Sequence, residues 1–417
     1  MRAVMRVTPP ANSKPLGTSD LARRCRRVPW QRRVSPSARQ RLGALPVILA
    51  ASVVLSACGG SESPASRHLS RPNTGSAAAA GNVIYGIVPP QLPPPGKLAK
   101  SVLLAEDLSG GRPFIIHLYT NWAEYPRSLP ALDAEIAAYA AHHMLVDLAL
   151  RYVPPAGDNG DVTGFASYVA AMVAHFAHDR AVAYLQVTNE ANSPFNAAAS
   201  DGAYKNAVGA LVDGIEAGAR AKSATGSHVR LGFNWFSSFG TQADRGWWSS
   251  VGRAGGATFA SDVSWVGIDL YPGTYIPPSL PAPGSGHLAA TAASDVSQAL
   301  DNLRANLMPL AGLGSRVAMG ISEIGWATIP PARPLSEQAE LVKAFMAGAC
   351  SVAARDHLEF VQWFEMADGT SPTKANPLST GLASADLVPG PGYTAYRDVV
   401  RRGCRALPGF GARVPRP

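Results

Sequence analysis

Eight apolar segments of strand length, separated by segments of helical character, constrain the fold of this 417-residue chain more than any other feature. The eight segments are Asn82–Val88, Phe114–Trp122, Met144–Tyr152, Val182–Glu190, Val229–Trp235, Ser264–Pro272, Arg316–Trp326 and His357–Met366. Each is almost continuously apolar, which is typical of parallel strands whose outer face is covered by helices. Most intervals show apolar residues at helical spacing, for example Leu129–His143, Phe165–Phe176 and Glu337–Ala353. The interval after the fifth segment is glycine-rich, and its expected helix has the weakest pattern of the set.

A closed (β/α)8 barrel and an open, doubly wound sheet both alternate strands with helices. A doubly wound sheet usually has a glycine-rich turn after its first strand. Here the first strand leads into Pro93, Pro94 and Pro95, which cannot form a phosphate-binding loop. Eight strands in about 330 residues are normal for a (β/α)8 barrel with loop insertions. We therefore predict one α/β domain, a single (β/α)8 TIM barrel, over residues 82–417.

The positive charge of the chain is concentrated at its N-terminus. The formal net charge is +8, but residues 1–42 contain 11 Lys or Arg and a single acidic residue, Asp20. The other residues contain 26 Lys or Arg and 28 Asp or Glu, a net charge of −2. The folded domain therefore gives no reason to expect nucleic acid as a partner.

Residues 1–57 have the organisation of an export signal with a long basic region. The uncharged stretch from Leu42 to Ala57 spans 16 residues, which is short for a membrane-spanning helix. The segment Leu55-Ser56-Ala57-Cys58 resembles the lipobox of bacterial lipoproteins. This resemblance implies cleavage before Cys58 and attachment of lipid to that residue. An ordinary signal peptide followed by a chance cysteine is the alternative.

Residues 58–81 are rich in Gly, Ser, Ala and Pro and have no hydrophobic periodicity. Such a segment predicts a flexible tether between a lipid anchor and the barrel. We therefore expect an extracytoplasmic protein of the cell envelope, anchored at the outer membrane or on the periplasmic face. In that environment Cys350 and Cys404 form either a disulfide or two buried thiols, and the sequence favours neither.

Polar and aromatic residues occupy the C-terminal ends of the predicted strands, where a (β/α)8 barrel builds its site. They are Trp122, Asn189, Glu190, Asn234, Asp269, Tyr271, Glu323, Trp326 and Trp363. Aromatic rings stack on the apolar faces of sugars, and carboxylates and amides bond hydroxyl groups, so this set predicts a carbohydrate site. Glu190 and Glu323 follow the fourth and seventh strands, and two carboxyl groups are what cleavage of a glycosidic bond requires. The sequence contains no phosphate loop or cluster of metal ligands, so we expect no cofactor.

With these motifs, the chain from about Asn82 to about Arg405 resembles clan A of the retaining (β/α)8 glycoside hydrolases, which includes cellulase-like and xylosidase-like families. The resemblance implies that Glu190, in the pair Asn189-Glu190, is the general acid/base and that Glu323 is the nucleophile. It also implies that Asn189 bonds the sugar 2-hydroxyl.

The resemblance assigns two further residues and fails at two positions. Tyr271 is expected against the nucleophile, and Trp363 is expected at the floor of the site. Many clan members have an arginine where this chain has Thr120 and Asn121. Several have a histidine where this chain has Asp269, which either positions Tyr271 or bonds a sugar.

The leading hypothesis is a retaining β-glycoside hydrolase that acts on an extracytoplasmic oligo- or polysaccharide and is expected to be a monomer. A transglycosylase with the same two glutamates is a close variant, because the covalent intermediate can be transferred to a sugar instead of water. The departures at the second and sixth strands support a different alternative, a non-catalytic glycan-binding or envelope-assembly lipoprotein.

Overall fold

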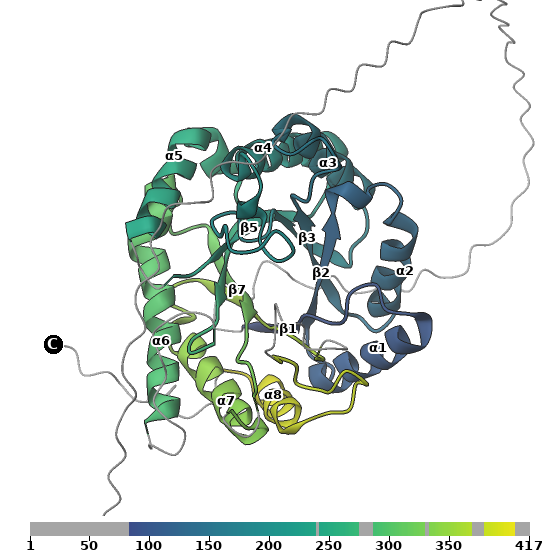
Figure 1. Ribbon diagram of the computed structural model, residues 1–417, viewed down its shortest axis with the longest axis vertical. Helices are drawn as coiled ribbons and strands as arrows, with labels where there is room; N and C mark the ends of the chain where they lie inside the picture. The colour runs from purple at the N-terminus through teal and green to yellow at the C-terminus, as the bar shows by residue number, and fades with distance from the viewer. Residues whose placement is uncertain (1–82, 239–241, 275–286, 330–332, 369–378, 405–417) are drawn as a thin grey trace, which may run out of the picture. The chain divides into compact units, whose positions relative to one another are not determined.

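A computed structural model describes residues 83–238, 242–274, 287–329, 333–368 and 379–404 of the chain. In this part of the chain, eight parallel strands form a closed barrel in sequential order, and β8 pairs with β1 (Figure 1). The strands are β1 (Ile84–Ile87), β2 (Phe114–Asn121), β3 (Leu145–Arg151), β4 (Val182–Val187), β5 (Arg230–Phe236), β6 (Trp265–Leu270), β7 (Ala318–Ile324) and β8 (Leu358–Trp363). The predicted (β/α)8 TIM barrel is confirmed. The predicted export signal, tether and Cys58 lie outside the described residues.

Helices surround the strands in an outer ring (Figure 1). They are α1 (Pro95–Ser109), α2 (Leu129–Ala140), α3 (Val162–His175), α4 (Ala207–Thr225), α5 (Gln242–Asp262), α6 (Leu288–Asn302), α7 (Leu335–Val352) and α8 (Pro391–Arg402). The interval after β5, where the sequence pattern for the expected helix was weakest, contains α5. This helix is interrupted at Gly256, whose φ of 55° is a backbone conformation that suits glycine. None of the described helices is both long and apolar enough to cross a membrane.

Large aromatic side chains fill the barrel interior near the amino ends of the strands. Trp265 of β6 and Phe360 of β8 pack edge to face, with 5.3 Å between their ring centroids, and both are fully buried. Glycines on the neighbouring strands leave room for these rings. A Cβ atom on Gly232 would lie 2.3 Å from the Trp265 ring, and one on Gly320 would lie 2.2 Å from Phe360. The strand glycines therefore set the volume that the interior aromatics occupy.

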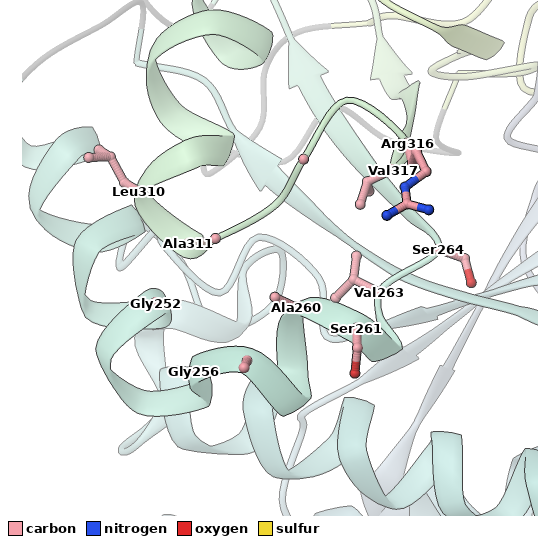
Figure 2. Close-up of a pocket in the computed structure, with 13 residues that line it drawn as sticks. Gly252, Gly256, Ala260, Ser261, Val263, Ser264, Leu310, Ala311, Arg316 and Val317 are labelled. Atoms are coloured by element: carbon pink, nitrogen blue, oxygen red, sulfur yellow. The ribbon is translucent and has the colours of Figure 1, made fainter.

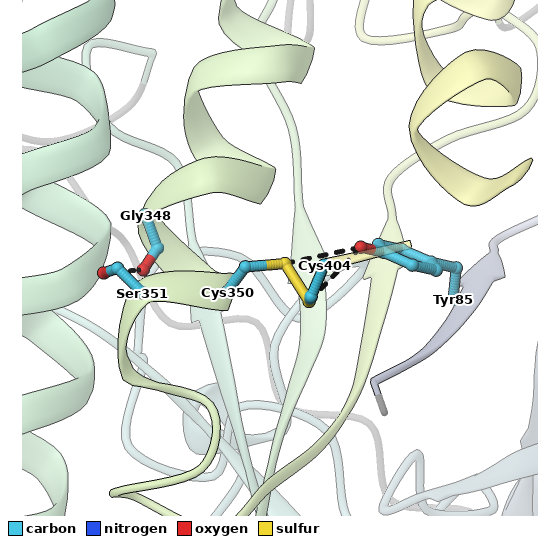
Figure 3. The surroundings of a disulfide bond; sticks show 5 residues. All are labelled: Tyr85, Gly348, Cys350, Ser351 and Cys404. Carbon is cyan, nitrogen blue, oxygen red and sulfur yellow. Dashed lines mark hydrogen bonds between the residues drawn. A yellow bond between two sulfur atoms is a disulfide. The ribbon is translucent and has the colours of Figure 1, made fainter. Parts of the chain in front are cut away.

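The seam between the last and first strands is covered by the C-terminal part of the chain. Helix α8 lies beside α1 (Figure 1), and the Tyr393 hydroxyl donates to the Leu104 carbonyl at 2.8 Å. Cys350 of α7 and Cys404, just after α8, form a disulfide with their Cα atoms 5.3 Å apart. Figure 3 shows this disulfide next to Tyr85 of β1, whose hydroxyl lies 3.4 Å from the Cys350 sulfur. The disulfide therefore joins the two last helical segments beside the strand seam.

Removal of the disulfide should destabilise the barrel. Replacement of both Cys350 and Cys404 by alanine opens a covalent loop with a sequence separation of 54 residues. The chain-entropy relation gives about 4 kcal/mol for a loop of that size, and observed losses typically run from about 2 to 4 kcal/mol. Urea unfolding of the oxidised wild-type protein and the double variant measures the difference. A reductant should lower the wild-type midpoint and leave that of the variant unchanged, and equal midpoints for oxidised wild type and variant would contradict the expectation.

Candidate active site

The carboxyl ends of the strands surround a cleft of about 1070 Å³. Residues at or just after the carboxyl end of each of the eight strands contribute to its walls, as expected for the functional end of a (β/α)8 barrel. Four of the residues singled out in the sequence line it, namely Asn189, Glu190, Tyr271 and Glu323. The cleft is thus the place where the two predicted carboxyl groups meet.

Glu190 and Glu323 lie next to each other although β4 and β7 are on different sides of the barrel. One carboxyl oxygen from each of Glu190, Glu323 and Asp269 lies within 4.8 Å of the others. Retaining glycosidases hold their two carboxyl groups about 5–5.5 Å apart, and inverting enzymes hold them about 6.5–9.5 Å apart to admit a water molecule. The spacing in this cleft agrees with the shorter class.

The two glutamates have different surroundings, and those of Glu190 favour the protonated acid. Burial, followed by the negative charge of Glu323, raises the pKa of Glu190 to about 8. A hydrogen bond from Ser200 and the charge of Arg151 act in the opposite direction. A carboxyl group with its pKa raised in this way holds its proton to a higher pH than an ordinary glutamate. Glu190 can therefore donate a proton at neutral pH.

Two residues after β4 have a positive φ, a backbone conformation that residues other than glycine rarely adopt. Thr188 has a φ of 67° and Glu190 a φ of 50°. Two backbone N–H groups are fixed by buried side chains. That of Asn189 donates to Asp201 at 2.7 Å, and that of Glu190 donates to Asn234 at 2.7 Å. Strained backbone of this kind is concentrated at functional sites, where the surrounding structure maintains it.

Glu323 accepts hydrogen bonds from two phenol groups, one on each carboxyl oxygen. The Tyr271 hydroxyl donates to Oε2, and the Tyr119 hydroxyl donates to Oε1 at 2.5 Å. Burial and the charge of Glu323 hold the pKa of Tyr119 well above its usual range, so this phenol keeps its proton and remains a donor. Both oxygens of Glu323 therefore act as hydrogen-bond acceptors.

Sequence reasoning did not find Tyr119. It compared Thr120 and Asn121 with the arginine of clan A, one and two positions further along β2. The alternation of side chains along a strand could have identified it. His117 faces the barrel interior, where it bonds Asp147 at 2.9 Å, so Tyr119 must face the same way.

Asn234 and Asp269 are fully buried and form hydrogen bonds that support the residues of the site. Asp269 accepts hydrogen bonds from Asn234 and Ser322, each at 2.5 Å. Burial and the charges of both glutamates raise the pKa of Asp269 well above its usual range. The Asn234 amide also donates to Asn189 at 2.8 Å. Asp269 therefore supports side chains of β5 and β7, and its two expected uses, positioning Tyr271 or bonding a sugar, stay predictions.

The Asn189 side chain is already engaged in several hydrogen bonds. Its amide nitrogen donates to the Ala199 carbonyl at 2.9 Å. Its oxygen accepts from Gln186 at 3.1 Å as well as from Asn234. These contacts fix the orientation of an amide that lines the cleft beside Glu190.

Trp363 is not at the floor of the cleft, and this corrects the expectation drawn from the resemblance. It is fully buried between the barrel wall and the surrounding helices, with its ring near Phe345 of α7 and Tyr396 of α8. Its indole N–H donates to the Thr380 carbonyl at 3.2 Å. The next residue, Phe364, lines the cleft instead. Because successive side chains of a strand point to opposite faces, an error of one residue moves the expected ring to the wrong side of the barrel wall.

The other two predicted tryptophans are also packed in the protein and are not among the residues that line the cleft. Trp122 stacks on Tyr152, with the ring centroids 5.9 Å apart. Trp326 lies under the guanidinium of Arg333, 5.3 Å from the ring centroid. Both rings therefore stabilise the loops above the barrel.

Loops and helix α5 supply further cleft residues that were not among the predicted site residues. Ser200, which bonds Glu190, belongs to the loop between β4 and α4. Phe195 in the same loop and Trp247 of α5 line the cleft. Glu365, after β8, also lines it, and burial followed by the charges of Asp368 and Glu323 raises its pKa to about 8. These side chains depend on loop conformation, which residue spacing does not encode.

A second hollow, of about 840 Å³, lies at the opposite end of the barrel. Figure 2 shows it between the helical segments that carry Gly252 and Leu310 and the turn that carries Arg316. Ser264 and Val317, which line it, immediately precede β6 and β7. Small residues make up most of its wall. Conserved chemistry in this fold belongs to the other end, so we assign the hollow no part in the site.

Solved structures with the same fold are carbohydrate-active proteins by name. The structure of GH5_18 from Streptomyces cattleya in complex with GlcNAc has a TM-score of 0.55 at 15% identity, covering 81% of this chain and 82% of that chain. Fungal β-1,4-galactanases give 0.52 at 12%, covering 72% and 91%. The family 1 β-glucosidase from Thermotoga maritima gives 0.54 at 11%, covering 77% and 97%. No protein-family model and no curated protein sequence matches the chain. At these identities the likeness establishes the barrel fold.

The proximity of the two glutamates predicts a coupled titration. Replacement of Glu323 by Gln removes the negative charge that raises the pKa of Glu190, so that pKa should fall. Carbon-13 NMR of labelled glutamate, with Glu190 assigned from a Glu190→Gln sample, measures the change. Glu337→Gln is the matched control, because it removes another buried carboxyl group, at the start of α7, and should leave Glu190 unaffected. An unchanged Glu190 titration in Glu323→Gln would show that the two groups do not interact.

Proposed function

We propose that the protein is a retaining glycoside hydrolase that cleaves β-glycosidic bonds by double displacement. The observation that carries this proposal is the closely spaced pair of glutamates with unequal surroundings. Glu190 is buried with a pKa near 8, and Glu323 accepts two phenolic hydrogen bonds. A protonated acid beside a carboxylate acceptor is the arrangement that general acid catalysis and nucleophilic attack require together.

In the first step, a Glu323 oxygen attacks the anomeric carbon while Glu190 gives its proton to the departing glycosidic oxygen. The bond from the sugar to its leaving group breaks as the bond to Glu323 forms. Glu190, now ionised, then accepts a proton from water, whose oxygen displaces Glu323 from the same carbon. The two inversions give net retention of configuration. Tyr119 and Tyr271 orient Glu323 throughout, and Asn189 faces the sugar beside Glu190.

The class of substrate follows from the cleft and is consistent with the named neighbours. Its walls combine acidic and amide side chains with exposed or half-buried aromatic rings, which suit neutral sugars. The neighbouring structures are named for β-glucosidase and β-1,4-galactanase activity, or contain GlcNAc or Manβ1-4GlcNAc. Substrates that contain β-linked glucose, galactose, mannose or N-acetylglucosamine are therefore the first to test.

The N-terminal sequence supports an extracytoplasmic location, which we propose together with the activity. A lipid on Cys58 and a tether over residues 58–81 would hold the barrel near a membrane of the cell envelope. The disulfide between Cys350 and Cys404 fits an oxidising compartment. A glycan of the envelope is the substrate that such an anchor brings within reach.

Purified protein should hydrolyse at least one member of a panel of β-linked oligosaccharides of these four sugars, and proton NMR should show that the β-anomer forms first. Glu323→Gln should lose activity by about four orders of magnitude or more, because no nucleophile remains. Glu190→Ala should retain more activity on an activated aryl glycoside, whose leaving group needs no proton, and azide should restore turnover with formation of a glycosyl azide.

Glu337→Gln serves as the control for loss of a buried carboxyl group and should keep wild-type activity. Initial release of the α-anomer would exclude the double displacement. Products longer than the substrate would identify the transglycosylase alternative. Binding of the same glycans without turnover would favour the non-catalytic alternative.

A further inference from the structure

Phe195 is the most exposed large apolar side chain among those that the structure describes, with 84% of its surface accessible, and it lines the cleft. A single exposed aromatic residue is common on protein surfaces and needs no explanation by itself. Its position gives it significance, because it lies only five residues after Glu190, in the loop between β4 and α4.

The loop that carries Phe195 is fastened to the barrel on both sides of the ring. On one side, the Asn192 side chain makes two hydrogen bonds with the backbone of Phe236, at 2.7 and 2.9 Å. On the other side, Arg151 donates to the Ala198 carbonyl at 2.8 Å. The ring is therefore exposed on a loop that hydrogen bonds fix to the barrel. A ligand that binds its apolar face does not have to order a flexible segment, which would cost binding free energy.

The same loop is joined directly to the proposed acid. The backbone N–H of Ser193 donates to the Glu190 carbonyl at 2.9 Å, and the Ser200 hydroxyl donates to the Glu190 carboxyl group. In the proposed reaction Glu190 protonates the oxygen of the leaving group, so the leaving group lies on the Glu190 side of the cleft. Phe195 is thus placed on that side.

We propose that Phe195 stacks on a sugar ring of the leaving group, which makes the protein selective for oligo- and polysaccharides over glycosides with small leaving groups. The inference rests on the proposed function and adds the chemical class of the leaving group. Sugar rings present C–H groups on one face, and an accessible phenyl ring covers that face with a gain in buried apolar area.

The test compares two substrates that share the sugar attacked by Glu323 and differ in the leaving group. One is the best β-linked oligosaccharide from the panel, and the other is the corresponding β-glycosyl fluoride, whose fluoride cannot contact Phe195. Phe195→Ala should lower kcat/KM for the oligosaccharide about ten- to one-hundredfold, mainly through KM, because the apolar contact is lost. The fluoride should react within about twofold of wild type, and Phe195→Trp should restore the oligosaccharide reaction.

Leu103→Ala is the control, because Leu103 is another exposed apolar residue, 60% accessible, and lies on α1 away from the cleft. It should change neither reaction. A loss in kcat for the oligosaccharide with KM unchanged, or equal losses on both substrates, would mean that Phe195 acts through Glu190 or another shared part of the site, and no loss on the oligosaccharide would mean that it contacts no sugar. Each of these results overturns the inference while the hydrolase proposal stands.

Binding separates this inference from failure of the proposed function. If the wild-type protein hydrolyses nothing, affinity for the same oligosaccharides is measured by NMR titration. Weaker binding by Phe195→Ala than by wild type and Leu103→Ala would support the stacking contact although hydrolysis fails. Equal binding by all three, or binding by none, would overturn it.

Discussion

Hydrogen bonding between β8 and β1 closes the sheet, and the rest of the structure depends on this closure. In a closed parallel barrel all strands end on one rim. Glu190 and Glu323 are 133 residues apart in the sequence, yet their carboxyl oxygens lie within 4.8 Å. The docking of α8 on α1 and the nearby disulfide cover the seam at which this closure occurs. The stability of the C-terminal segments and the geometry of the site are therefore linked through one pair of strands.

Three buried carboxyl groups in close contact would repel one another if all were charged and lacked hydrogen bonds. In this site each of the three receives a different set of hydrogen-bond donors. Glu323 receives two phenol groups, and Asp269 receives an amide and a hydroxyl. Glu190 has Ser200 as its side-chain donor and keeps its proton to a higher pH. The two phenol groups of Tyr119 and Tyr271 are the described hydrogen-bond donors to Glu323. Tyr119 thus supplies a donor at the strand where clan A members often have arginine.

The eight strands and the two glutamates were predictable because apolar runs and the polar residues that end them are local properties of the sequence. The exact strand register at the rim was not evident from the sequence, so Trp363 was predicted where Phe364 lines the cleft, and Tyr119 was missed although strand alternation from His117 places it on the inner face. The sequence also could not reach Ser200, because that contact depends on how the loop after β4 folds back over Glu190. The glycines of the interval after β5 weakened the helical pattern of α5 in the sequence. The position of this helix on the outside of the barrel is set by packing of its Trp248 and Phe259 against Phe233.

The fit between the strand glycines and the interior rings restricts how this barrel can change in evolution. Gly232 and Trp265 share one volume, as do Gly320 and Phe360. A side chain added at Gly320 requires a smaller residue in place of Phe360, whereas one added at Gly232 would also lie 2.5 Å from the Trp265 backbone oxygen, which a smaller residue there cannot relieve. Homologous chains should therefore keep glycine at position 232 and show compensated changes at positions 320 and 360, while the loops on the opposite rim diversify freely. Compensated substitutions of this kind let two barrels keep the same architecture after their sequences have lost detectable similarity.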